Sequence, residues 1–324
     1  MNNELLAVTT AYFLDLAVGD PQWRWHPVRI IGKLVARLEL GLNTGRINKR
    51  LAGAMLVVLT TSAAVFSVFG ILRLAGFIHP ALHFVISVTL IYFSLSIKAL
   101  DVEANKVYGA LKNKNIREAR NSLSMIVGRD TQNLEEPQVI RAAVETVAES
   151  TMDGIIAPLF YAFLGGPVLV WAYKAINTLD SMVGHRNERF TEFGKASAGL
   201  DGIVNFIPAK ITCILIGISC LFYGRDFLNS FRWGLKYFFR GFNFNGVVTE
   251  AAMAGALKVQ LGGVNFYDSV PVAKPLIGEP ACHLRVYHIR ESIRLAYLSS
   301  FIFLMIWIFS FFMTADFVGK WSLM

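Results

Sequence analysis

The sequence has few charges and little cysteine. Charged residues make up 17% of the 324 positions and hydrophobic residues 54%, a balance that is not typical of a soluble globular protein. The 3 cysteines, Cys213, Cys220 and Cys282, show neither the paired spacing of a zinc site nor the even count of a disulfide framework. We therefore expect a membrane protein whose cysteines are core residues.

Common nucleotide and hydrolase motifs are also lacking. There is no G-x-x-x-x-G-K-[ST], no G-x-G-x-x-G that opens a helix, no H-E-x-x-H and no G-x-S-x-G. No nucleic-acid-binding module, internal repeat or low-complexity tract is present. The net charge of +8 is explained by cytoplasmic loops and by attraction to anionic lipid headgroups. Any nucleotide site must be of another kind.

Long apolar windows are present instead, and about 20 helical residues cross a hydrocarbon core. Windows at about 51–72, 74–97 and 295–315 carry no formal charge and are predicted to span. A first helix at about 4–19 contains Asp15 and has no basic region ahead of it, so we interpret it as an uncleaved helix and not as a signal peptide.

Two further windows are weaker. Window 154–173 is interrupted by Gly165-Gly166-Pro167, and window 205–224 is short once its lysine and proline are excluded. We interpret both as partial or re-entrant helices. The predicted fold is therefore an all-α, polytopic membrane protein with interfacial and re-entrant helices, forming a single integral membrane domain over residues 1–324.

Basic residues indicate the orientation. Segment 24–50 carries seven of them against the single acid Glu39, which predicts that it is cytoplasmic. Following the chain through the next two spans also places 98–153 in the cytoplasm. Segment 174–210 lies outside if both weaker windows cross fully, and inside if both are hairpins or partly inserted; the Gly-Gly-Pro break favours the inside.

An acidic row lies at 141–153. In a helix, Arg141, Glu145, Glu149 and Asp153 recur every fourth residue and share one face. Carboxylates stacked in this way repel one another, so they require a cation, which can be Arg141, a basic residue from elsewhere or a magnesium ion. A solvated helix face ahead of a membrane segment is the plain alternative.

Polar residues concentrate in the stretch KAINTLDSMVGHRNERFTEFGKASAGLDGIVNFIPAK, at 174–210. Asn177 and Asp180 share a face at the polar end of an apolar helix, where polar groups need partners. Three cations follow and form a candidate anion site: Arg186, Arg189 and Lys195. The alternative for each is a cation that reaches to the headgroups.

A second Asp-Gly pair and a small-residue segment follow. Asp201 and Lys210 flank an apolar stretch, and the plain alternative for Asp201 is an N-cap of the following helix. Segment 249–263, TEAAMAGALKVQLGG, is predicted to be a helix that bears Glu250 and Lys258. Its small residues favour close helix packing.

Four blocks together resemble one family: LDLAVGDPQWRWHPVRIIGKL, AAVETVAESTMDGIIAPLFYAFLGGP, the 176–210 stretch and TEAAMAGALKVQLGG. In this order they are similar to adenosylcobinamide-phosphate synthase, a membrane enzyme of cobalamin biosynthesis. The resemblance implies an ATP- and Mg²⁺-dependent amide ligase. Its substrates would be adenosylcobyric acid, a corrinoid, and aminopropanol phosphate, the free amino alcohol or a related ethanolamine.

The resemblance also implies site residues. Negative charge that develops on an activated carboxylate is stabilised by metal and fixed cations. The expected catalytic residues are Glu145, Glu149, Asp153 and Asp180, with Glu149, Asp153 and Asp180 as metal ligands. The expected substrate and phosphate ligands are Asn177, Arg186, Arg189, Lys195, Asp201, Lys210, Glu250, Lys258, Asp20 and His26, and the corrin-facing aromatic residues are Trp23, Trp25 and Trp171.

The chain departs from the family pattern at Ser150, at Gly202 and in the segment NFNGVVTE. These changes keep open a paralogue with altered catalysis that acts as a membrane scaffold, and intramembrane charges with a broken helix keep open a transporter. The expected location is a prokaryotic inner membrane with the site facing the cytoplasm. The expected partners are lipid and other corrin-pathway enzymes, without nucleic acid.

Overall fold

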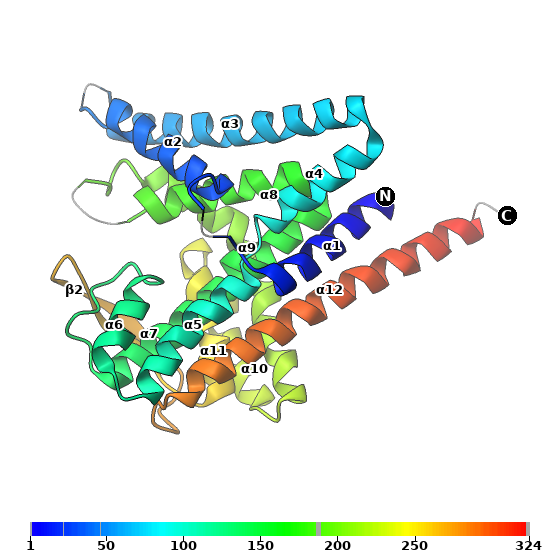
Figure 1. The fold of residues 1–324 in the computed structure, drawn as a ribbon. Helices are drawn as coiled ribbons and strands as arrows, with labels where there is room; N and C mark the ends of the chain where they lie inside the picture. Colours follow the sequence, from blue (N-terminus) through cyan, green and yellow to red (C-terminus); the bar gives the residue numbers. More distant parts are fainter. Residues whose placement is uncertain (1, 22, 46, 186–188, 322–324) are drawn as a thin grey trace. The chain divides into compact units, whose positions relative to one another are not determined.

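A computed structural model describes residues 2–21, 23–45, 47–185 and 189–321 (Figure 1). Within this part the protein is almost entirely helical, and 5 helical stretches are long and apolar enough to cross a membrane: Lys49–Ile78, Pro80–Lys112, Glu136–Val183, Lys195–Phe222 and Tyr287–Met313. The prediction of an all-α polytopic membrane protein is confirmed.

The chain divides into two compact units. Unit 1 comprises residues 1–98 and 153–208, and unit 2 comprises 99–152 and 209–324. The division falls inside two long helical stretches, one at the π-helical turn Met152–Ile156 and one within α9, Lys195–Phe222. The core of each unit is described separately.

Unit 1 is a helical bundle. It contains α1 (Asn2–Val18), α2 (Pro27–Leu42), α3 (Lys49–Ile78), α4 (Pro80–Tyr92), α8 (Ala157–Val183) and the first half of α9. Helix α3 packs against α2, α4 and α8, and α1 packs against α4 and α8. The first helix is confirmed.

The predicted helix at 74–97 begins in the wrong place. Helix α3 continues through Ile78, and α4 begins at Pro80 after a turn at His79 (Figure 1). Proline has no N–H to donate and its φ suits the first helical turn, so it starts a new helix. Helix α4 ends at Tyr92, and α5 (Ile97–Lys112) begins four residues beyond Phe93.

Helix α8 doubles back on itself. Its backbone is non-helical at Gly165 (φ −159°, ψ 28°) and Gly166 (φ 60°, ψ −153°), and the second pair is accessible essentially only to glycine. The rings of Tyr161 and Tyr173 stack at 5.1 Å, although a straight helix would separate them by about 18 Å. The predicted break is confirmed as a helical hairpin. That it re-enters the bilayer remains a prediction.

Unit 2 surrounds the small-residue helix α11 (Asn245–Leu257). The unit also contains α6 (Ile116–Ser124), α7 (Glu136–Thr151), α10 (Phe227–Phe238), the 3₁₀ turn η2 (Phe242–Phe244) and α12 (Tyr287–Trp321). Helix α11 packs on α10, α7 and α12. An antiparallel hairpin of β1 (Leu261–Tyr267) and β2 (Val270–Ile277) covers it, with Gly263 opposite Lys274 and Asn265 opposite Val272.

Two further predicted element boundaries are wrong. Helix α11 stops at Leu257, where Lys258 adopts φ 57°, so Gly262 and Gly263 belong to strand β1 and not to the predicted helix. Helix α9 begins at Lys195, much earlier than position 205. Asp201 therefore lies inside α9, and its interpretation as an N-cap is wrong.

Candidate functional site

Several helix ends meet in unit 1. The carboxylate of Asp15, near the end of α1, accepts the backbone N–H groups of Ile97 and Lys98 at 2.9 and 3.2 Å. These are first-turn N–H groups of α5, which have no partner within their own helix. The Tyr92 hydroxyl, at the end of α4, donates to the carbonyl of Gly19. The ends of α1 and α4 and the start of α5 are thus joined.

The π-helical turn that precedes α8, Met152–Ile156, is hydrogen-bonded to the same group of helix ends. The backbone N–H and the hydroxyl of Ser96 both donate to the carbonyl of Gly154 at 3.1 Å. A Cβ atom at Gly154 would lie 2.3 Å from the Ser96 oxygen. Glycine is required here for the close approach, which places its neighbour Asp153 at the edge of the junction.

A hydrogen-bonded network extends from Asp153. The Tyr173 hydroxyl donates to Asn205 Oδ1 at 3.1 Å and lies 3.3 Å from the Asp153 carbonyl oxygen. Asn205 Nδ2 donates to Asp201 Oδ2 at 3.0 Å, and Asn177 Nδ2 donates to Asp201 Oδ1 at 3.4 Å. Tyr173 and Asn205 are buried, so their rotamers are fixed by packing as well as by hydrogen bonds.

The ammonium group of Lys174 belongs to this region. Lys174 interacts electrostatically with the carboxylates of Asp153 and Asp20. Asp20 in turn lies 2.9 Å from the imidazole of the buried His26, whose ring packs edge-on against Phe93 at 5.3 Å. The expectation that Asp20 and His26 order the turn after α1 is consistent with this pair.

We call this set the helix-end cluster: Asp15, Asp20, Asp153, Tyr173, Lys174, Asn177, Asp201 and Asn205. It combines carboxylates, amide groups, a phenol and an ammonium group, which are the groups needed to bind charged substrates and to move a proton. Four of its members were predicted: Asp20, Asp153, Asn177 and Asp201. The sequence interpretation did not assign roles to Asp15, Tyr173 and Lys174, although a charge inside or beside an apolar window is itself a signal.

The predicted anion site forms ion pairs within unit 1. Arg189 donates to both carboxylate oxygens of Glu39, at 3.1 and 2.5 Å. Burial alone would raise the pKa of Glu39, but the hydrogen bonds from Arg189 and Asn43 outweigh it and hold the pKa below its usual value. These two side chains also line a cavity of about 430 Å³ with Lys49. Arg186 lies outside the described residues.

Lys195 is paired as well. Its ammonium group lies 2.5 Å from Glu192, and Arg50 lies 2.5 Å from the other oxygen of the same carboxylate. The hydrogen bond from Lys195, followed by that from Arg50, lowers the pKa of Glu192 to about 2. The role of Lys195 in phosphate binding remains a prediction.

Asp180 belongs to unit 1 and Lys210 to unit 2. A Cβ atom at Gly184 would lie 1.9 Å from Asp180 Oδ1, so the carboxylate of Asp180 folds over this glycine. Lys210 belongs to unit 2, where it is 8% exposed and its ammonium group lies 5.9 Å from the ring centre of Phe238. Their predicted roles are not tested by these positions.

Glu145 belongs to a buried ion-pair network in unit 2. Arg129 donates to its Oε2 at 2.5 Å, the N–H of Gly262 donates to its Oε1 at 2.8 Å, and Arg141 lies 3.7 Å away. Arg129 and Arg141 also donate to Asn265 Oδ1. The cation that the acidic row requires at Glu145 is therefore supplied by arginine.

Glu149 and Glu250 lie beside that network. Glu149 is exposed. Its Oε1 would lie 3.6 Å from a Cβ atom at Gly246, which is one turn before Glu250 on α11. Glu250 is 2% exposed, and its Oε1 lies 3.7 Å from Lys274 Nζ. Burial raises the pKa of Glu250 to about 8; Lys274 opposes the rise, and Glu145 adds to it.

The side chains of Lys258 and Trp171 contact other parts of the protein. Lys258 lies 3.0 Å from Asp226, which links the end of α11 to the start of α10. Trp171 is 2% exposed and donates to the carbonyl of Leu90 at 2.9 Å. Its predicted role as an open face for a corrin is wrong because the ring is enclosed. Trp23 and Trp25 are 48% and 59% exposed and remain candidates.

Among the described residues, no group of three His, Cys, Asp or Glu side chains is placed to share one metal ion. Magnesium that binds with phosphates needs only one or two carboxylates, because waters and phosphate oxygens complete its shell. Asp153 and Asp201, which both border the Tyr173–Asn205 pair, meet that smaller requirement. Glu149, Asp153 and Asp180 remain predicted ligands.

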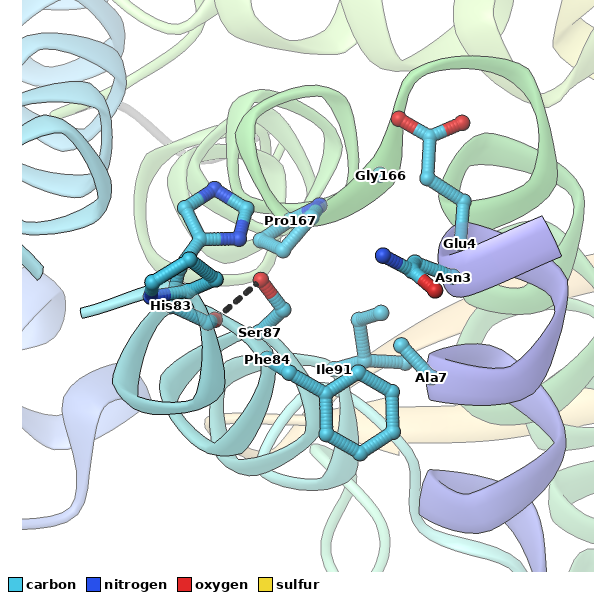
Figure 2. Close-up of a pocket in the computed structure, with 10 residues that line it drawn as sticks. Asn3, Glu4, Ala7, His83, Phe84, Ser87, Ile91, Gly166 and Pro167 are labelled. Atoms are coloured by element: carbon cyan, nitrogen blue, oxygen red, sulfur yellow. Dashed lines mark hydrogen bonds between the residues drawn. The ribbon is translucent and has the colours of Figure 1, made fainter. Parts of the chain in front are cut away.

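A small cavity lies at the bend of α8. Figure 2 shows Glu4 and Asn3 on one side and His83 on the other, with the Ser87 hydroxyl donating to the His83 carbonyl at 2.8 Å. The cavity has a volume of about 70 Å³, and Gly166 lines it. No residue predicted for the site reaches it, so it is separate from the helix-end cluster.

Comparison with known proteins identifies the family. The model of the CobD/Cbib protein family matches residues 8–296. The chain belongs to the CobD/CbiB family. The cobalamin biosynthesis protein CobD of Geobacter metallireducens is 45% identical over 290 residues, 90% of this chain and 91% of that protein. The protein CobD of Clostridium perfringens is 44% identical over 276 residues, 85% and 88% of the two chains.

A third CobD/CbiB relative, the cobalamin biosynthesis protein CbiB of Salmonella typhimurium, is 40% identical over 299 residues, 91% of this chain and 94% of that protein. No solved structure matches the chain. Membership of the CobD/CbiB family supports a role in cobalamin biosynthesis, and the resemblance drawn from the four sequence blocks is confirmed at the level of the family.

Proposed function

We propose that this protein is an adenosylcobinamide-phosphate synthase, which uses ATP to join aminopropanol phosphate to a propionate carboxylate of adenosylcobyric acid. One observation supports this most strongly. Residues from two blocks of the family resemblance, Asp153 in one and Asn177 and Asp201 in the other, lie in one hydrogen-bonded network although they are far apart in the sequence. Separate motifs that converge on one polar cluster are typical of a site and not of packing alone.

The proposed reaction has two steps. In the first, an oxygen of the propionate carboxylate attacks the γ-phosphorus of ATP, the bond to ADP breaks, and an acyl phosphate forms. In the second, the amine nitrogen attacks the acyl carbon, phosphate leaves, and the nitrogen loses its proton. Both steps concentrate negative charge near the acyl group, and fixed cations and donors stabilise that charge.

Members of the helix-end cluster are assigned to these needs. Lys174 supplies the fixed positive charge, because its ammonium group interacts electrostatically with the carboxylates of Asp153 and Asp20. Asp153 accepts the proton of the amine, and Tyr173 with Asn205 holds Asp201 in place. Magnesium, when bound with ATP, neutralises phosphate charge, and Asp153 and Asp201 are its proposed ligands.

The test is an assay of full-length protein in lipid nanodiscs with adenosylcobyric acid, aminopropanol phosphate and Mg-ATP. We expect one ADP per amide product, measured by coupled liquid chromatography and mass spectrometry, and no product without magnesium. Free aminopropanol and ethanolamine compared in parallel identify the preferred amine. Intact, well-folded protein that releases neither ADP nor amide would exclude the ligase and favour the scaffold paralogue.

A transporter is the second candidate, favoured by the broken helix α8 and by the meeting of helix ends, since discontinuous helices are typical of transporter sites. It predicts accumulation of a corrinoid in sealed proteoliposomes without conversion. The ligase predicts amide formation in open nanodiscs, where no gradient exists. The same preparation therefore distinguishes the two.

Orientation is tested by labelling. Of the described cysteines, Cys213 and Cys220 are buried and Cys282 is partly exposed, so Cys282→Ser gives a background that reacts weakly with an impermeant thiol reagent. Thr191→Cys on that background should be protected in intact cells and labelled in inverted vesicles. Labelling from outside would separate the site from intracellular ATP and exclude the ligase.

A further inference from the structure

Helix α10 (Phe227–Phe238) and the turn that follows it have an uncommon composition. Segment 227–249 contains three basic residues and no Asp or Glu, and eight residues between positions 227 and 244 are aromatic. Helices that lie in the surface of a membrane combine Lys and Arg with Trp, Phe and Leu in this way. The sides of the helix on which these residues lie decide whether α10 has such a surface.

One side of α10 is packed inside unit 2. Its buried residues are Ser230, Gly234 and Tyr237. The Ser230 hydroxyl donates to the carbonyl of Ala252 on α11 at 2.9 Å. A Cβ atom at Gly255 of α11 would lie 2.3 Å from the carbonyl oxygen of Asn229, so the two backbones are in contact. This side of α10 is therefore filled by α11.

The opposite side carries an exposed apolar strip. Leu228, Leu235 and Phe239 have the spacing i, i+7 and i+11, so they lie within about 40° of one another around the helix axis. Their exposed fractions are 75%, 48% and 87%. Helix α6 of the same unit differs, because its exposed residues are all polar: Arg117, Glu118, Asn121 and Ser124. A contiguous apolar strip is the kind of surface that a membrane or a protein partner covers.

The three cations form a second strip beside the apolar one. Arg232, Lys236 and Arg240 are four residues apart, so they follow one another around the axis between the apolar strip and the buried side. Lys236 Nζ lies 4.5 Å from the ring centre of Trp233, and Arg232 forms an exposed pair with Glu279 at 3.3 Å. Basic side chains that extend over apolar surface keep their charge at the level of polar headgroups.

Contacts between α9 and α12 place the start of α10 at a boundary of the apolar layer. The uncharged window 295–315 begins inside α12. Near the end of α9, the hydroxyl of Ser219 lies 3.1 Å from that of Ser299, which is within this window. Arg225 donates to Glu291, which precedes the window, at 3.0 Å. The chain thus leaves the apolar layer between Ser219 and Arg225, and α10 begins two residues later.

We propose that α10 lies in the surface of the bilayer, with its apolar strip among the acyl chains and its cationic strip at the phosphates of anionic lipids. Lipid is favoured over a second copy of this chain, because an isologous contact would bring a strip of like charges against itself. A free anion would leave the apolar strip uncovered. The inference goes beyond the proposed ligase function and does not depend on it, because it concerns contact with lipid alone.

The depth of α10 is measured on full-length protein in nanodiscs that contain phosphatidylglycerol, with a nitroxide label on the Cys282→Ser background. Leu235→Cys places the label in the apolar strip, and Asn121→Cys places it on the polar side of α6 as the control. We expect the label at position 235 to collide with a water-soluble nickel chelate roughly tenfold less often than the label at position 121. Its collisions with dissolved oxygen, which concentrates in acyl chains, should be more frequent.

Two outcomes of the depth measurement would overturn the proposal. Nickel accessibility at position 235 equal to that at position 121 would show that the apolar strip faces water. Low accessibility to both nickel and oxygen would show that the strip is covered by protein, which is the result expected for a second copy of this chain.

The cationic strip is tested by lipid selectivity. The test variant replaces its three cations by glutamine: Arg232→Gln, Lys236→Gln and Arg240→Gln. The control variant removes the same charge from an exposed segment of unit 2: Lys112→Gln, Lys114→Gln and Arg117→Gln. Native mass spectrometry counts the lipids that each protein retains from nanodiscs with equal amounts of phosphatidylglycerol and phosphatidylcholine.

We expect the test variant to lower the ratio of retained phosphatidylglycerol to phosphatidylcholine about threefold, since cations near a membrane surface attract anionic lipids and lipids bound elsewhere dilute the effect. The control variant should behave like wild type. All six substituted side chains are exposed, so both variants should keep the melting temperature of wild type. An equal decrease in both variants, or displacement of phosphatidylglycerol from wild type by inorganic phosphate, would overturn the assignment to anionic lipid.

Discussion

In unit 1 the candidate site is joined mainly by hydrogen bonds from hydroxyl, amide and backbone groups, some of them at helix ends, whereas in unit 2 full charges are paired with one another. The helix-end cluster uses a tyrosine hydroxyl and two side-chain amides around Asp153 and Asp201, and the hydroxyl of Ser96 donates beside it to the Gly154 carbonyl. The network around Glu145 uses two arginines. The helix-end cluster lies among stretches long and apolar enough to span a membrane, and the hairpin and α11 lie outside them.

The difference follows from the solvation of charge. Helix ends leave N–H and C=O groups without partners, so a side chain such as Asp15 is held by those dipoles without a countercharge. A buried carboxylate with no such end nearby needs a cation, because the desolvation of an unpaired charge costs several kcal/mol. We therefore expect substitutions in unit 1 to change chemistry first, and substitutions of the paired charges in unit 2 to change stability first.

The largest expected effect is on the stability of unit 2. Arg129→Met removes the closer of the two arginines that pair with Glu145, which is 2% exposed, and leaves only Arg141 at 3.7 Å. Breaking a buried pair costs about 3–5 kcal/mol. The melting temperature in nanodiscs should fall by more than in any other variant considered. Replacing both residues, Arg129→Met with Glu145→Met, should recover most of the loss. Equal melting temperatures of the single and double variants would show that the burial of a charge is not the cause of the lost stability.

The next effect is on chemistry in unit 1. Asp153→Asn keeps the shape of the side chain but removes its charge, and the loss of one preorganised group at a site typically costs about 10²–10³ in kcat. Lys174→Met should have a similar effect. Amide formation is measured, with the melting temperature as control. Normal turnover in both variants would contradict the assignment of the helix-end cluster.

The sequence allowed much of this site to be predicted, and the limits have physical causes. Motif residues such as Asp153, Asn177 and Asp201 were found because polar groups in apolar surroundings are conspicuous. Tyr173 was not, since an aromatic residue at the end of an apolar window resembles a core residue. Its neighbours are brought to it by the reversal of α8, and Gly165-Gly166-Pro167 predicts a break without predicting its direction.

Long-range pairing explains the remaining differences. The sequence allowed a basic residue from elsewhere as a partner of the acidic row but did not identify it as Arg129, because only Arg141 has the four-residue spacing within the same helix. The strand β1 was assigned to a helix, because the alanine-rich run before it continues into glycines without a clear stop. The left-handed turn at Lys258 ends the helix instead, and glycine or asparagine is the usual signal for such a turn.

Glu250 should make stability depend on pH. Its folded pKa of about 8 lies above its usual value of 4.5, so its contribution to stability is fully present below about 4.5 and is lost as the pH rises through 8. The groups that face it are Glu145 and Glu149 of α7, Arg129 and Lys274. The melting temperatures of wild type and Glu250→Gln are measured at pH 5.5 and at pH 8.5. We expect the melting temperature of wild type, relative to that of Glu250→Gln, to be lower at pH 8.5 than at pH 5.5. If the melting temperatures of wild type and Glu250→Gln change with pH in parallel, Glu250 does not titrate in this range.

The bend of α8 should be sensitive to a single methyl group. Gly166→Ala forces an alanine into φ 60°, ψ −153°, which costs about 1–3 kcal/mol. The melting temperature and amide formation should both decrease, because the bend holds Tyr173 against Asp153. Gly70→Ala in α3, where a Cβ atom meets nothing within 4 Å, is the matched control and should be neutral or stabilising.

The smallest effect is expected at the ion pair between Arg189 and Glu39, where Arg189 is 58% exposed and Glu39 is 7% exposed. If the pair is structural, Arg189→Ala lowers the melting temperature slightly and leaves KM for ATP unchanged. Adding Glu39→Gln should then restore stability, because no uncompensated carboxylate remains. If Arg189 instead holds phosphate, KM rises at least tenfold in Arg189→Ala and Glu39→Gln does not correct it. That result would extend the site of unit 1 from the helix-end cluster to the cavity beside α2.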